Sequence, residues 1–159
     1  MCRTDVSDCS EKAALQRIRA RADRGDANAM YNLGGMYDGG LGGVGKNQKV
    51  VREWYEKAAL KGESRAAYNL ACSCRDGEGG PVDLVLAAKW FKSSAESGHV
   101  PGACNYGIAL ARGYGVPQDF GEAERWLRAS ARAGYELAEQ KIEELQMRRL
   151  LRGTPLFRI

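Results

Sequence analysis

The chain has 159 residues, with a net charge of +4 at neutral pH, an apolar fraction of 44% and a charged fraction of 28%. These values are typical of one compact domain or one short stack of repeats. Because no segment before the last residues is strongly basic, we expect no nucleic-acid partner. No apolar run approaches the ~18–20 residues that a membrane span needs, so we expect no membrane span either.

The cysteines and the first residues bear on the compartment. Five cysteines are an odd number, and their spacing gives no framework of disulfide pairs. The segment Met1–Asp5 does not begin an apolar secretory signal and is too acidic for a typical transit peptide. We therefore expect a cytoplasmic protein.

At the start of the chain, residues 1–9 are expected to form a tail. A helix is predicted over residues 10–24, because small and apolar side chains recur there at helical spacing before Gly25. Ser10 is its expected N-cap. Residues 10–25 match the second helix of the repeat that follows, without its partner.

Three complete units come next, at residues 26–62, 63–98 and 99–134. Their tryptophans stand 36 residues apart, at Trp54, Trp90 and Trp126. Each unit ends in a glycine, at Gly62, Gly98 and Gly134. Such spacing indicates stacked repeats, in which each unit buries its apolar face against its neighbours. With one per unit, the tryptophans are expected in the core.

Within each unit, the pattern predicts a first helix, a glycine-rich turn and a second helix. The first helix has small and apolar residues on one face, which in the first unit are Ala29, Leu33, Gly34 and Tyr37. A small residue at the position of Gly34 lets the second helix approach closely. The second helices are expected to begin at equivalent N-caps, namely Asn47, Asp83 and Asp119.

After the third unit, residues 135–151 match a first helix, which would cap the stack with a polar outer face. Residues 152–159 are expected to form a C-terminal tail. The end of the chain holds four arginines and no acid after residue 146: Arg148, Arg149, Arg152 and Arg158. The simplest interpretation is that cations complement the dipole at a helix C-terminus.

The unit Ala-x3-Leu-Gly-x2-Tyr, glycine turn, Asn/Asp, Ala, Trp-aromatic, Ala-Ala, Gly resembles the Sel1-like repeat, a relative of the tetratricopeptide repeat. The resemblance covers about residues 10–150, with local departures such as Cys74 and Leu110 at the position of Tyr37 and Tyr106 at that of Leu33. It implies an all-α fold, a right-handed α-solenoid of helix-turn-helix repeats. It also implies an adaptor or assembly scaffold.

The alternative is a β-lactam-binding or hydrolysing enzyme, because a secreted, cysteine-rich bacterial branch of the same family is linked to that activity. The cysteines of that branch pair at regular positions, whereas those of this chain are irregular. His99, the single histidine, is expected to be an ordinary loop residue. Cys72 and Cys74 form a C-x-C, not the C-x2-C of structural zinc sites. We therefore expect no enzyme, no metal site and no cofactor.

The resemblance implies that the first helices line a concave groove, and helical geometry predicts which side chains face it. The predicted groove residues are Asn28, Tyr31, Asp38, Arg65, Tyr68, Arg75, Ile108, Arg112 and Gln140. Cys72, Cys104 and Glu144 are expected beside them; a functional pair of the two thiols is one interpretation, and two small, semi-buried residues is the simpler one. Asn32 and Asn69 are expected mainly to hydrogen-bond the neighbouring unit.

Tyrosine and arginine are frequent interface hot spots. We therefore expect a non-catalytic scaffold that receives a protein or peptide partner in this groove. Self-association through the end helices is a second way in which the chain could form contacts.

Overall fold

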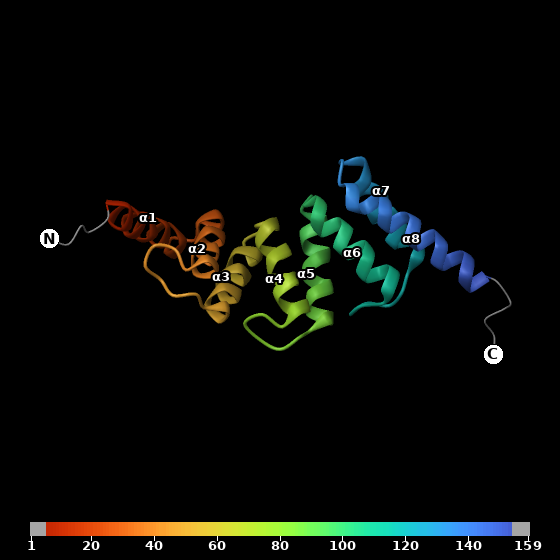
Figure 1. Ribbon diagram of the computed structural model, residues 1–159, viewed down its shortest axis with the longest axis horizontal. Coiled ribbons are helices and arrows are strands. Elements are labelled where there is room, and N and C mark those ends of the chain that lie inside the picture. Colours follow the sequence, from red (N-terminus) through yellow and green to blue (C-terminus); the bar gives the residue numbers. More distant parts are fainter. Residues whose placement is uncertain (1–5, 154–159) are drawn as a thin grey trace. The chain divides into compact units, whose positions relative to one another are not determined.

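The computed structural model describes residues 6–153, and the side chains of residues 10–151 (Figure 1). Within residues 6–153 the chain forms eight helices and no strand, so the predicted all-α architecture is confirmed. The helices are α1 (Val6–Asp23), α2 (Ala27–Gly39), α3 (Gln48–Leu60), α4 (Ser64–Asp76), α5 (Leu84–Glu96), α6 (Val100–Arg112), α7 (Phe120–Arg132) and α8 (Glu136–Gly153).

The chain divides after Asp83 into two compact units, each larger than one sequence repeat. From here on, the first and second unit mean these two parts of the chain. The first unit contains α1 to α4 and the second contains α5 to α8. Within each unit every helix packs on the next one along the chain, and in the second unit α6 also contacts α8 (Figure 1). Neighbours in sequence are thus neighbours in space, as in a repeat stack.

The end helices differ in length from their predictions. Helix α1 begins at Val6, so part of the predicted tail 1–9 is helical and Ser10 lies inside the helix instead of capping it. The physical reason is that no glycine or proline precedes Ser10 within the helix to stop it. Helix α8 extends to Gly153, beyond the predicted end at residue 151. The rest of the predicted C-terminal tail lies outside the described residues.

The second helices begin where the sequence predicts. The side chains of Asn47 and Asp119 accept hydrogen bonds from the backbone N–H groups of Val50 at 3.3 Å and Glu122 at 2.8 Å. Helix α5 begins directly after Asp83. N-caps of this kind satisfy backbone donors that have no partner within the helix.

The first helices are capped too, and His99 takes part in this. Asp26 caps α2 by accepting from the N–H of Ala29 at 3.0 Å. His99 holds the same place before α6, and its Nδ1 accepts from the N–H of Gly102 at 3.3 Å. His99 therefore lies in the connection before α6, as predicted, and it also serves as the N-cap of that helix.

The packing face predicted for the first helices is largely buried. Leu33, Leu70 and Tyr106 occupy one repeat position and all are buried. Cys74 and Leu110 are buried at the next position, where Tyr37 is only half-buried. These first-helix side chains therefore form part of the core of each unit.

The tryptophans are less buried than expected. Trp90 is buried, but Trp54 and Trp126 are half-buried. The Trp54 ring has the ammonium of Lys57 above it, 4.3 Å from the centroid. Trp126 meets Tyr106 edge to face, with centroids 5.8 Å apart. These two rings lie at the margin of the core, where one side packs and the other meets polar groups or water.

Gly34 allows α2 and α3 to approach closely. A Cβ atom at this position would lie 2.7 Å from Cε1 of Tyr55. In the second unit of the chain, a Cβ on Gly107 would lie 2.9 Å from Cγ of Leu127. Ordinary van der Waals contact needs more room, so the prediction that a small residue is required here is confirmed.

Glycines in the turns rest against the start of an earlier helix. Gly79 has φ +72°, and a Cβ there would overlap the carbonyl oxygen of Gln48, the first residue of α3. Gly115 has φ +70° and stands in the same way against Leu84, the first residue of α5. Both the left-handed backbone and the contact require glycine.

Helix α1 holds the place of a second helix. Gly42 has φ +70°, and a Cβ there would lie 3.2 Å from the carbonyl oxygen of Glu11 in α1. The residue of α1 that the turn meets is thus the counterpart of Gln48 and Leu84. We call Gly42, Gly79 and Gly115 the seat glycines.

Candidate partner-binding surfaces

In the first unit, an aromatic and cationic cluster joins three helices. The guanidinium of Arg65, on α4, lies 4.4 Å from the centroid of the Tyr31 ring, on α2. Tyr31 stacks on Tyr55 of α3, with centroids 5.7 Å apart and an interplanar angle of 27°. Arg65 also pairs with Glu63 at 2.9 Å. Two predicted groove residues, Tyr31 and Arg65, are therefore in direct contact.

A polar cleft of about 180 Å³ opens beside this cluster. We call it the α2–α4 cleft, and it is lined by Asp38, Gln48, Val51, Tyr55, Asn69, Cys72, Ser73 and Glu78. Asp38 accepts a hydrogen bond from Nε2 of Gln48 at 2.7 Å. The cleft carries carboxylates and amides but no lysine or arginine.

Tyr55 forms part of the floor of this cleft. Burial raises the pKa of its phenol, and the side chain of Asn69 hydrogen-bonds to it. The phenol is therefore neutral at physiological pH. Asn69 belongs to the repeat after that of Tyr55, so the predicted bond between neighbouring repeats is present. Asn32 instead donates to Asn28, within the same helix, at 3.0 Å.

Cys72 brings a thiol into the α2–α4 cleft. It is half-buried, burial raises its pKa, and the Tyr68 side chain hydrogen-bonds to it. Tyr68, another predicted groove residue, thus adjoins the cleft. Cys72 and Cys104 lie in different units, and Cys104 is fully buried, so the expectation that its side chain faces a groove is wrong.

Two predicted groove residues of the first unit are satisfied by near neighbours. Arg75 is held by Asp76 through two hydrogen bonds, from Nε and from one terminal nitrogen, both at 2.7 Å. This contact lowers the pKa of the Asp76 carboxyl. Asn28 is exposed and is the acceptor of the Asn32 bond. Both side chains lie at the surface and neither lines the cleft, although the charge of Arg75 acts on the Cys72 thiol that does.

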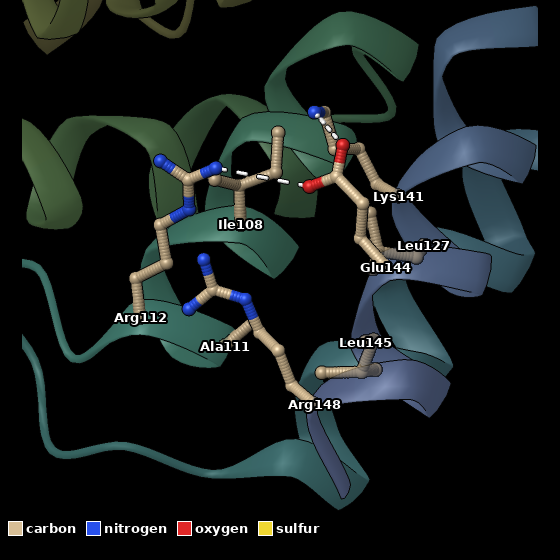
Figure 2. A pocket seen from close by; sticks show the side chains of 8 residues that line it. All are labelled: Ile108, Ala111, Arg112, Leu127, Lys141, Glu144, Leu145 and Arg148. Atoms are coloured by element: carbon tan, nitrogen blue, oxygen red, sulfur yellow. Dashed lines mark hydrogen bonds and ion pairs between the residues drawn. The ribbon is translucent and has the colours of Figure 1, made fainter. Parts of the chain in front are cut away.

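In the second unit, a shallow pocket lies between α6 and α8 (Figure 2). We call it the α6–α8 niche; it is a shallow depression with a cavity volume of about 10 Å³. Helix α6 contributes Ile108, Ala111 and Arg112, α7 contributes Leu127, and α8 contributes Lys141, Glu144, Leu145 and Arg148. The niche thus has an aliphatic base and a charged rim.

Charges converge on Glu144 in this niche. The Glu144 carboxylate lies 2.5 Å from Nζ of Lys141 and 3.8 Å from a terminal nitrogen of Arg112. The hydrogen bond from Lys141, with the charges of Arg112 and Arg148, lowers the pKa of Glu144. The carboxylate is therefore ionised at physiological pH.

The niche includes two of the residues predicted for the groove. Ile108 and Arg112 line it together, as expected for groove residues, whereas Gln140 is exposed on α8 and does not line it. Lys141 was missed, and Arg148 was assigned only to the helix dipole. The signal that could have found them is their divergence from the earlier repeats at the same positions.

No group of three or more histidine, cysteine, aspartate or glutamate side chains in the described residues could hold a metal ion. Cys72, Cys74 and Cys104 are free thiols. The imidazole of His99 caps a helix. Across residues 6–153, no helix has the length and apolar character needed to cross a membrane.

The comparisons with known proteins agree with this architecture. The family model for the Sel1 repeat matches residues 27–63, 64–99 and 100–135. A Sel1 repeat protein from Oxalobacter formigenes superposes with a TM-score of 0.77 and 31% identity, over 82% of this chain and 54% of its own. The uropathogenic Escherichia coli protective antigen c5321, which displays an SLR fold, superposes with a TM-score of 0.78 and 28% identity, over 84% of this chain and 28% of its own.

Two further proteins are similar to this chain either in fold alone or over a short stretch of sequence. Helicobacter pylori cysteine rich protein B superposes with a TM-score of 0.63 over 85% of this chain and 96% of its own, but at 18% identity it is similar in fold alone. A 56-residue stretch is 38% identical to HRD3A of Arabidopsis thaliana, an ERAD-associated E3 ubiquitin-protein ligase component, and covers 35% of this chain and 8% of that protein. This chain thus spans a small part of that relative. Three matched repeats and the helix pairs that form them establish that the chain belongs to the Sel1 repeat family.

Proposed function

We propose that this chain is a non-catalytic protein-interaction scaffold that receives a partner peptide or helix along its first helices. Sel1 repeat proteins generally act as scaffolds for protein interactions, which supports the general role. The observation that carries the proposal is the Tyr31–Arg65 contact beside the α2–α4 cleft. This contact presents a half-exposed aromatic and cationic surface next to the α2–α4 cleft.

The chemistry of this surface suits a peptide. Tyrosine and arginine offer a large contact area with a polar handle, and such residues dominate binding energy at interfaces. The cleft adds carboxylate and amide groups that hydrogen-bond to a peptide backbone or to a polar side chain. The free thiols of Cys72, Cys74 and Cys104 support a reducing compartment such as the cytoplasm.

The test is affinity capture with the purified chain, followed by mass-spectrometric identification and quantification of the captured proteins. The double variant Arg65→Ala with Tyr68→Ala should lose most of the capture while keeping its helical circular dichroism. Lys49→Ala removes one exposed cation from α3 and should leave capture unchanged. Equal capture by the folded double variant and the wild type would refute the assignment of the surface.

Self-association through the end helices stays a prediction. Its support is the exposed apolar side chains of α8, namely Met147, Leu150 and Leu151. Sedimentation velocity over a concentration series tests it, with Leu150→Gln as the variant. A monomer at every concentration would exclude it.

A further inference from the structure

We infer that the α6–α8 niche receives the carboxylate of a glutamate or aspartate side chain that lies beside an aliphatic residue in the partner segment. The inference rests on the proposed function and names the chemistry of one contact. Its basis is an excess of cations in the niche, set at positions where the repeat does not need them.

The niche carries more positive than negative charge. Arg112, Lys141 and Arg148 surround the single carboxylate of Glu144 (Figure 2). Glu144 pairs with Lys141 and with Arg112, whereas Arg148 forms no ion pair with a described residue. With three cations and one carboxylate, the niche carries a net positive charge that favours the binding of a second anion. A charge-assisted hydrogen bond to arginine or lysine is stronger than a neutral one.

These cations are not part of the repeat. Arg112 and Arg148 occupy one repeat position, which holds Gly39 in α2 and Asp76 in α4. Lys141 stands where all three earlier first helices have asparagine, at Asn32, Asn69 and Asn105. The helix dipole favours a cation at Arg112, in the last turn of α6, but not at Lys141, in the first half of α8. The fold alone therefore does not account for their convergence.

Aliphatic side chains adjoin the charges. Ile108 and Leu145 line the niche. Met147 and Leu151 are 58% and 52% exposed and follow Glu144 along one side of α8, at i+3 and i+7. A partner acid bound at the rim would place its neighbouring side chain on this apolar surface. Such a surface favours a protein segment over a nucleic acid, whose phosphates are recognised through rows of cations.

Glu144 competes with the partner carboxylate for the same cations. Its side chain is 48% exposed and can turn towards solvent. If the niche serves binding, removal of this competing charge strengthens the binding of an acidic peptide. If the ion pairs served only to hold α6 and α8 together, the same change would weaken the protein and add nothing to binding.

The probe is a short amidated peptide with one glutamate between leucines, and its counterpart with glutamine. Fluorescence anisotropy with the whole chain should give tighter binding of the glutamate peptide, by about threefold or more. Arg148→Gln should remove this preference, and Glu144→Gln should increase it. Arg132→Gln, which removes the same charge from the exposed side of α7, should not change it.

Equal affinity for the two peptides would overturn the inference, and so would equal losses with Arg148→Gln and Arg132→Gln. A free-acid glutamine peptide that binds as well as the amidated glutamate peptide would assign the niche to a chain terminus and overturn it too. If the peptides fail while capture still depends on Arg65 and Tyr68, the proposed function stands and only this inference falls.

Discussion

The guanidinium of Arg65 lies 4.4 Å from the centre of the Tyr31 ring and links α4 to α2 across one repeat boundary. The same Tyr31 ring also stacks on Tyr55 of α3. One tyrosine thus connects three helices, so a side chain that we propose for partner binding also contributes to the fold. The proposal therefore predicts that binding and stability are coupled through this ring.

A double-mutant cycle measures this coupling. Arg65→Ala and Tyr31→Leu should each destabilise the chain, and the double variant should lose less than the two losses together. The expected coupling is about 0.5–1 kcal/mol, the size of an exposed cation–π contact. Urea unfolding followed by circular dichroism gives the four free energies. The control cycle pairs Tyr31→Leu with Arg75→Ala, which should show no coupling.

Two neighbouring glycines of α2 should respond oppositely to alanine. Gly34→Ala places a Cβ 2.7 Å from the Tyr55 ring and should cost about 1–3 kcal/mol, as overpacking does. At Gly35 the nearest atom, the hydroxyl oxygen of Tyr55, lies at 4.0 Å. Gly35→Ala should therefore be neutral or stabilise by up to about 1 kcal/mol through helix propensity. Urea midpoints of both variants test this, and a neutral Gly34→Ala would contradict the close approach.

Asp26 should make the first unit sensitive to acid. The hydrogen bond from the N–H of Ala29, with the pairing to Arg21, holds the pKa of this carboxyl below its ordinary value of 3.8. A carboxyl with a lowered folded pKa stabilises the fold above its unfolded pKa. This contribution disappears as the pH falls through the folded value.

Asp26→Asn keeps an acceptor for the cap and removes the titration. The difference in melting temperature between wild type and Asp26→Asn should be constant near neutral pH. It should shrink as the pH falls below about 3.8. Other carboxyls titrate equally in both proteins, so the difference isolates Asp26. A difference that does not change with pH would show that the cap is insensitive to charge.

The described cysteines should differ in reactivity towards an alkylating agent. Cys74 and Cys104 are fully buried, and burial raises the pKa of Cys104 to about 11. Cys72 is half-buried, so it should react first, although more slowly than a free thiol because its pKa is also raised. Peptide mapping of a Cys2→Ser, Cys9→Ser chain after timed labelling measures the order. Cys72→Ser is the control, and labelling of Cys104 as fast as Cys72 would contradict its burial.

Much of the fold follows from positions that recur. The caps at Asn47 and Asp119 and the close approach at Gly34 are each local consequences of residue type, so spacing alone predicts them. Ser10 misled the prediction, because a good N-cap residue caps a helix only where the chain before it is not helical. The half-exposure of Trp54 depends on what covers its ring, which spacing does not encode.

The candidate sites were only partly predictable for a related reason. Helical geometry placed Ile108 and Arg112 on one side of α6, and both line the α6–α8 niche. Arg148 lines the niche only because α8 packs beside α6, a relationship that its own segment does not reveal. Cys104 shares a repeat position with Tyr31 and Tyr68, but its small side chain is covered where the tyrosines reach the surface.

The seat glycines have a consequence for how this chain can change in length. The loops from each seat glycine to the following N-cap cover residues 42–47, 79–83 and 115–119. The additional residue of the first repeat lies in this stretch, after the contact with the earlier helix has been made. Repeats are therefore kept in phase by contact and not by an equal number of residues. Insertions just after Gly42, Gly79 or Gly115 should be absorbed as longer surface loops. An insertion just before one of these glycines would instead disturb its contact with the earlier helix and the packing of the repeats that follow.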